Sequence, residues 1–367
     1  MKQTDKKKMD KSVAFHGRML KIIIPRASIG YFKLVNALET TLFKGRKSRR
    51  FRTEEIFIPQ KDGNMRACIC SEYTYKKTGN VYENAPENAS TAENTLKNSD
   101  GVLKKTSAIA DNKSEKSSRP AILWIHGGGY SMGVPEQDFV FIDRILSAID
   151  AVILMPDYTL SVEKPYPKAL TDCYDALLWL KENAEKLGAD KNKIFVGGES
   201  AGGGLCAALC HYARDKGEVN IAFQMPLYPM LDDRPTRTNV NNNMPCWDTR
   251  SNIKAWKVYL GDLYGTDEVP YYAAPARVTD FTNLPPAITY IGDVEPFYAE
   301  TVDYFENLKK AGISAEYRVY PGCYHAFDVY CPNSNHTKNA IEFFKNRLVY
   351  AAKNYSAKQK QKEIQNT

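Results

Sequence analysis

Ser200 lies in a turn whose residue types favour nucleophilic chemistry. The turn, Gly-Glu-Ser-Ala-Gly over residues 198–202, follows the short apolar run 193–197. A Gly-x-Ser-x-Gly turn after a buried strand is so tight that the residues beside the serine must be nearly free of side chain. It raises the serine hydroxyl to the edge of a sheet, where amides of the next helix face developing negative charge. The pattern predicts a nucleophile, although an ordinary glycine-rich turn would share these residue types.

A second segment supplies the groups that acyl transfer needs. Residues 126–130 read His-Gly-Gly-Gly-Tyr and follow 121–125, which reads as a buried strand. Three consecutive glycines are costly in backbone entropy, so such a loop usually needs close approach to another group. In acyl transfer that group is the substrate oxyanion, bound by amides of this loop and by the amide after the nucleophile. We predict an oxyanion hole formed by Gly127, Gly128, Gly129 and Ala201, in which Gly127 either donates or only shapes the loop.

One of the five histidines occupies a position suited to a general base. His325 lies in the loop 320–328, after the strand-like run 315–320. A histidine beyond the C-terminal end of a strand can reach a serine on a neighbouring strand. The others lie in a basic leader, in the glycine loop, at the end of the helix behind the turn and in a polar run: His16, His126, His211 and His336. By elimination His325 is the predicted base, and His126 is expected to shape its turn.

The acid partner is expected just past the apolar run 287–292. Asp293 and Glu295 both lie there, and either carboxylate could hold the imidazole in the required tautomer. Spacing alone does not choose between them. The order serine, carboxylate, histidine along the chain is that of the α/β-hydrolase layout.

Together these segments resemble the hormone-sensitive-lipase family of α/β-hydrolase esterases. The resemblance covers roughly residues 120–350 and rests on His-Gly-Gly-Gly at 126, Gly-Glu-Ser-Ala-Gly-Gly at 198, Glu-Pro-Phe at 295 and Tyr-Pro-Gly at 320. In the family the acid immediately precedes the proline of its segment, which implies Glu295, with Asp293 as a neighbour that orients the loop. Glu199 stands where the family more commonly has aspartate. The resemblance also implies that the protein needs no metal ion or organic cofactor.

The function predicted from these residues is that of a serine carboxylesterase. Ser200, His325 and Glu295 would hydrolyse short- to medium-chain acyl esters through an acyl-enzyme intermediate. An amidase or formamidase could use the same triad. A non-catalytic ligand-binding module on the same fold is the alternative from another class.

The predicted fold is α/β, an α/β-hydrolase fold with a mostly parallel central sheet flanked by helices and covered by a helical cap. The alternation begins at residue 121, with strands expected at 121–126, 151–156, 193–198, 220–225, 286–292 and 315–320. Helices are expected near 136–149, 167–187, 200–215, 297–312 and 336–353. The predicted organisation is an N-terminal cap segment 1–50, a first core part 51–230 with a mobile insertion at 76–118, a cap insertion 231–276, a second core part 277–355 and a polar tail 356–367.

Charge and cysteine usage bound the partners and the compartment. Residues 1–53 contain 15 Lys and Arg against 3 Asp and Glu, so this leader is more positive than the whole chain, whose net charge is +7. Such a leader could contact nucleic acid or anionic lipid, but a solvated, partly helical cap segment is favoured because aromatic interleaving is missing. The eight cysteines show no disulfide or zinc spacing, which favours the cytoplasm. We expect a small-molecule ester substrate, no nucleic acid and no membrane span, with the oligomeric state open and a homodimer among the options.

Overall fold

The computed structural model describes most of the chain, with gaps near both termini and before the core. The expected insertion 76–118 lies almost entirely outside the described residues, as does most of the tail 356–367. The described residues are 8–23, 28–73, 77–78, 81–82 and 118–357.

The central sheet has eight strands in the described part of the chain, in the order β1-β2-β6-β5-β7-β8-β9-β10. β2 pairs antiparallel with β1 and with β6, and every pairing from β6 to β10 is parallel. The inner strands are apolar runs that are buried on both faces, as parallel sheets covered by helices require. Its strands are β1 Arg52–Gln60, β2 Gly63–Ser71, β5 Pro120–Ile125, β6 Val152–Pro156, β7 Asp190–Glu199, β8 Phe223–Leu227, β9 Ala287–Gly292 and β10 Ala315–Tyr320; β3 Lys77–Thr78 and β4 Val81–Tyr82 form a separate pair.

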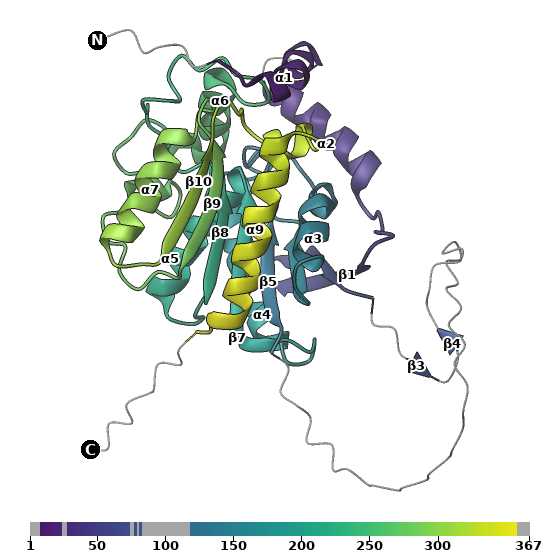
Figure 1. The fold of residues 1–367 in the computed structure, drawn as a ribbon. Helices are drawn as coiled ribbons and strands as arrows, with labels where there is room; N and C mark the ends of the chain where they lie inside the picture. Colours follow the sequence, from purple (N-terminus) through teal and green to yellow (C-terminus); the bar gives the residue numbers. More distant parts are fainter. Residues whose placement is uncertain (1–7, 24–27, 74–76, 79–80, 83–117, 358–367) are drawn as a thin grey trace, which may run out of the picture.

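Helices cover both faces of this sheet (Figure 1). α3 and α9 pack together on one face, whereas α4, α5 and α7 cover the other. Within the described residues, every helix is too short or too polar to cross a bilayer. The helices are α1 Lys11–Ile23, α2 Ile29–Phe43, α3 Phe139–Leu146, α4 Lys168–Asn183, α5 Ala201–Lys216, α6 Thr249–Leu260, α7 Tyr298–Lys310, α8 Phe327–Tyr330 and α9 Asn335–Asn354, with 3₁₀ turns at Pro135–Asp138, Gly261–Leu263 and Pro275–Arg277.

The predicted α/β-hydrolase alternation is confirmed, and the differences concern element ends. The helix expected at 136–149 is a 3₁₀ turn followed by the shorter α3, because Pro135 begins the turn and the chain leaves the helix at Ser147. β8 begins three residues later than expected, at Phe223. Because the parallel strands all end at one edge, the segments after β7, β9 and β10 meet there.

Candidate active site

Ser200 connects β7 to α5 through a strained backbone. Its φ is 56° and its ψ is −120°, a conformation that non-glycine residues rarely adopt. Backbone hydrogen bonds hold it there: its N–H donates to the carbonyl of Leu227 (3.0 Å) and its own carbonyl accepts from Met230 (3.0 Å). A Cβ at Gly198 would lie 2.5 Å from the carbonyl oxygen of Ile125, so the turn requires glycine beside the serine.

His325 meets Ser200 at the edge of the sheet. Its Nε2 lies 2.8 Å from the serine Oγ, although the two residues are 125 positions apart. The imidazole is 3% exposed and makes edge-to-face contacts with the rings of Tyr228 and Phe297. These contacts fix the plane of the ring, so that one nitrogen faces the hydroxyl and the other faces a carboxylate.

That carboxylate is Glu295, whose Oε2 lies 2.5 Å from Nδ1 of His325. The second oxygen accepts a hydrogen bond from the amide of Gly292 at the end of β9 (3.1 Å). Burial raises the pKa of Glu295, while the charge and hydrogen bond of His325 oppose that rise. A carboxylate in this position requires Nδ1 to carry the proton, which leaves Nε2 free to accept the proton of Ser200.

Asp293, the other candidate, uses its side chain to contact the backbone of the loop that carries His325. Its Oδ1 accepts a hydrogen bond from the amide of Gly322 at 2.6 Å. Gly322 has a φ of 69°, and the turn that it makes leads to His325. Of the two carboxylates left open by spacing, Glu295 therefore bonds the imidazole and Asp293 bonds the loop that carries it.

The glycine loop presents backbone amides beside Ser200. Gly128 and Gly129 have φ values of 110° and 61°, and both line the cavity next to the serine. The amides of Gly128, Gly129 and Ala201 have no hydrogen-bond acceptor among the described residues. Because Ala201 is the first residue of α5, its amide also lies at the positive end of the helix dipole.

The amide of Gly127 is already engaged. It donates to Oε1 of Glu199 at 2.7 Å, so of the two roles considered for Gly127 the structure favours shaping the loop. Glu199 is 8% exposed, and burial together with the negative charge of Asp138 raises its pKa well above the ordinary value. His126 also shapes the loop, as predicted, since its Nδ1 lies 2.8 Å from the carbonyl of Gly127 and its ring stacks on Tyr158.

A cavity of about 370 Å³ opens beside these groups. One wall is a stripe of α2 with i, i+4 spacing: Tyr31, Val35, Glu39 and Phe43. Sequence reasoning assigned none of these four to the site, although their i, i+4 spacing is the signal that could have identified a second, partly buried stripe on the helix. Among the aromatic residues of segment 231–276, Trp247 lines the cavity, whereas Trp256 and Tyr259 pack against Tyr130 of the core.

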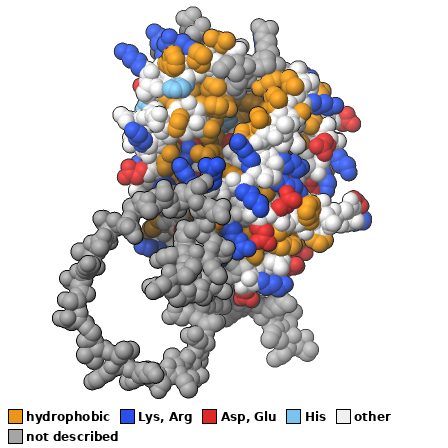
Figure 2. Space-filling model, turned by 90° about the vertical axis from the view of Figure 1, so that its right-hand side faces the viewer, with side chains coloured by type: hydrophobic (Ala, Val, Ile, Leu, Met, Phe, Trp, Pro, Cys, Tyr) orange, Lys and Arg blue, Asp and Glu red, His pale blue; other side chains and the backbone are white. Residues whose placement is uncertain are grey.

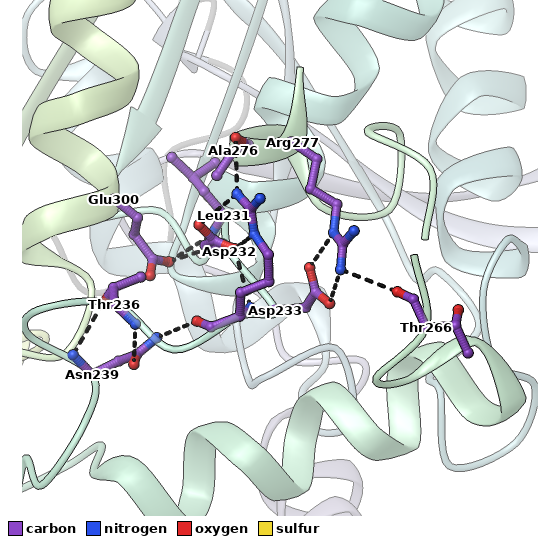
Figure 3. Close-up of polar contacts among 10 residues, drawn as sticks. Leu231, Asp232, Asp233, Thr236, Asn239, Thr266, Ala276, Arg277 and Glu300 are labelled. Atoms are coloured by element: carbon purple, nitrogen blue, oxygen red, sulfur yellow. Dashed lines mark hydrogen bonds and ion pairs between the residues drawn. The ribbon is translucent and has the colours of Figure 1, made fainter. Parts of the chain in front are cut away.

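A polar cluster fixes the loop that follows β8 (Figure 3). Two backbone amides of this loop donate to Oε1 of Glu300 on α7, at 2.8 and 3.2 Å. Asp233 accepts two hydrogen bonds from the guanidinium of Arg277, at 2.7 and 2.8 Å. The amide of Met230 in this loop donates to the carbonyl of Ser200 (3.0 Å), so the cluster ties the base of segment 231–276 to the site.

Comparisons with known proteins agree with this fold. Residues 122–329, more than half of the chain, match the family described as alpha/beta hydrolase fold. The chain therefore belongs to the alpha/beta hydrolase fold family. Esterase LipI of Mycobacterium tuberculosis is 32% identical over 205 residues, which are 55% of this chain and 63% of that protein. The arylesterase of Saccharolobus solfataricus is 30% identical over 218 residues, covering 58% of this chain and 70% of that protein.

A solved structure extends the likeness over nearly the whole chain. A bacterial heroin esterase superposes with a TM-score of 0.76 at 27% identity, covering 94% of this chain and 98% of that chain. By sequence the chain spans less than two thirds of LipI, one of the curated relatives that it matches. Among the described residues, no three His, Cys, Asp or Glu side chains gather as a set of metal ligands.

Proposed function

We propose that this protein is a serine carboxylesterase. The observation that carries the proposal is the hydrogen-bonded series from Ser200 through His325 to Glu295 at the edge of an α/β-hydrolase sheet. The names of the relatives, an esterase and an arylesterase, support ester bonds as the target. A purely ligand-binding role would leave the strained serine and its two partners without a purpose.

The reaction begins with attack of Ser200 Oγ on the ester carbonyl carbon while His325 Nε2 takes the hydroxyl proton. Amides of Gly128, Gly129 and Ala201 stabilise the negative charge that develops on the carbonyl oxygen. His325 then gives its proton to the leaving alcohol, and the acyl group remains on Ser200. In the second half His325 takes a proton from water while the water oxygen attacks the acyl carbon. The bond from that carbon to Ser200 Oγ then breaks, His325 returns the proton to Oγ, and the carboxylic acid leaves.

The cavity supports esters with short to medium acyl groups that carry no negative charge. Its volume of about 370 Å³ is at the lower end for small-molecule sites. Val35, Phe43, Phe141 and Trp247 supply much of its wall, and no lysine or arginine of the described chain lines it. A long acyl chain would exceed this volume unless it extended into solvent.

The test is hydrolysis of p-nitrophenyl acetate and butyrate together with labelling by a fluorophosphonate. The wild-type protein is expected to release nitrophenol and to become labelled, and Ser200→Ala should lose at least about 10⁴-fold in kcat and all labelling. The control is Ser131→Ala, which replaces a buried serine at the end of the glycine loop, outside the triad, and should retain labelling. Equal nitrophenol release by wild type and Ser200→Ala would overturn the proposal.

We also infer a cytoplasmic location. All eight cysteines fall in the described part of the chain and are free thiols, which suits a reducing compartment.

A further inference from the structure

The two N-terminal helices expose an unusual number of large apolar side chains. On α2, Leu34, Leu38 and Leu42 are each more than half exposed and follow one another at i, i+4 spacing. On α1, Phe15 and Ile22 are 69% and 78% exposed. Single exposed apolar residues are ordinary, but contiguous exposed stripes indicate an interaction surface.

The composition of α2 makes this exposure costly in water. The helix contains two charged residues, Lys33 and Glu39, and its buried residue is Phe32. The neighbouring stripe, which includes Val35 and Phe43, lines the cavity beside Ser200. The three leucines of the exposed stripe do not line that cavity. An amphipathic surface helix would carry polar side chains on its outer face, so the leucines call for an apolar partner.

Basic side chains surround these apolar stripes. Lys11 and Arg18 precede Phe15 and Ile22 by four residues, so charge and apolar surface share one side of α1. Exposed basic residues also occupy the loop after α2, and among the described residues no ion pair involves Arg46, Lys47 or Arg49. Figure 2 shows hydrophobic side chains gathered over the upper part of this face, with Lys and Arg side chains beside them.

We propose that this surface, formed by the exposed residues of α1, α2 and the loop 44–50, docks on an anionic lipid surface. Basic side chains beside exposed leucine and phenylalanine are the signature of helices that lie in a bilayer interface. A second copy fits less well, because a two-fold interface would bring like positive charges together. Nucleic acid would match the charge, but it offers no apolar phase for the aliphatic leucine stripe. Docking would place the cavity beside Ser200 directly behind the lipid-facing helix.

Flotation with lipid vesicles tests the proposal on the full chain. Wild-type protein is expected to float with phosphatidylcholine vesicles that contain about 30% phosphatidylserine, and to bind pure phosphatidylcholine more weakly. Binding should fall between about 0.05 and 0.5 M salt as the charges are screened. A triple variant, Leu34→Ser, Leu38→Ser and Leu42→Ser, should reduce vesicle partitioning at least about tenfold. Lys11→Gln with Arg18→Gln should abolish the preference for phosphatidylserine.

The matched control replaces apolar residues of similar exposure outside the two helices: Phe57→Ser, Val240→Ser and Tyr350→Ser. This control should float like wild type, and circular dichroism should show that both triple variants are folded. Absence of flotation by the wild type, or equal loss in both triple variants, would overturn the proposal. Sedimentation that shows a dimer broken by the leucine variant alone would assign the surface to a second copy instead. None of these readouts requires ester hydrolysis, so their failure is separate from failure of the proposed function.

Discussion

Ser200 combines a rare backbone conformation with a complete set of hydrogen-bonding partners. The φ of 56° is a strained conformation that the hydrogen bonds of the surrounding turn maintain. It places the serine hydroxyl 2.8 Å from Nε2 of His325, the base that can activate it as a nucleophile. The type and order of these residues could be predicted from the sequence because each motif has a distinct local pattern. The engagement of the Gly127 amide could not, because it depends on a contact with Glu199, which lies 72 residues away.

Replacement of the two carboxylates near His325 should have unequal effects. Glu295→Gln would offer the imidazole an amide in place of a charge, and kcat for p-nitrophenyl acetate should fall about 10⁴-fold. Asp293→Asn keeps a carbonyl oxygen that can accept the bond from Gly322, so its loss should be tenfold or less, about 1.4 kcal/mol. A larger loss in Asp293→Asn than in Glu295→Gln would place the acid of the triad at residue 293.

Glu39 should make stability depend on pH. Burial raises its pKa from 4.5 to about 7, although the nearby backbone amide of Gly133 opposes the rise. The folded state therefore favours the neutral acid, so the stability that this group contributes is present below pH 4.5 and is lost as the pH rises through about 7. Glu39→Gln keeps the size of the side chain but cannot ionise, so the variant does not lose this stability as the pH rises. Relative to wild type it should gain about 1–3 kcal/mol in free energy of unfolding between about pH 4 and pH 8.

Urea unfolding at both pH values measures this gain. Glu163→Gln, at an exposed glutamate, is the control and should show the same difference from wild type at both pH values. A gain for Glu39→Gln that does not change with pH would contradict the assignment.

At the scale of elements, α3 and α8 are joined by a buried ion pair close to the base. Arg144 Nη1 lies 2.5 Å from Oδ2 of Asp328, which also accepts from the hydroxyl of Tyr290. The two side chains are 7% and 0% exposed. Asp328 follows His325 by three residues, so the pair also anchors the histidine loop.

Arg144→Met should leave the Asp328 carboxylate buried without its cation and reduce the free energy of unfolding by about 3–5 kcal/mol. The control is Arg237→Met, which removes a bidentate pair with Asp303 whose side chains are 60% and 56% exposed and should cost less than about 1 kcal/mol. Urea denaturation of the three proteins measures both losses. Equal losses in the free energy of unfolding would mean that burial of the Arg144–Asp328 pair does not increase the cost of removing its cation.

At the scale of the whole molecule, the core and the presence of a helical cap could be predicted, whereas the way the cap lies over the site could not. Strands such as β5 and β9 are short apolar runs typical of a buried sheet, and β9 ends at the edge where Glu295 lies. α2 could be predicted as a helix, but its role in the cavity wall depends on how it lies over the sheet. That placement arises from packing between segments far apart in the chain, which local spacing does not encode.

The sheet register predicts that the segment between β2 and β5 can be shortened without loss of the fold. Cys70 of β2 pairs with Ile153 of β6, and Ile153 pairs with Ile122 of β5. The end of β2 and the start of β5 therefore lie two strand spacings apart, about 10 Å. Eight Gly and Ser residues in place of residues 74–117 can span up to about 26 Å, which is enough to close this gap.

Because the described cavity wall contains no residue of this segment, the shortened protein should keep kcat/KM for p-nitrophenyl butyrate within about twofold. Its melting temperature should stay within a few degrees of wild type, since closing a shorter loop costs less entropy. A folded variant with an unchanged melting temperature and a kcat/KM lowered more than tenfold would show that residues 74–117 contribute to the substrate site. Labelling of Ser200 by the fluorophosphonate separates that outcome from a disrupted turn, because labelling requires the nucleophile and its base but little of the acyl pocket.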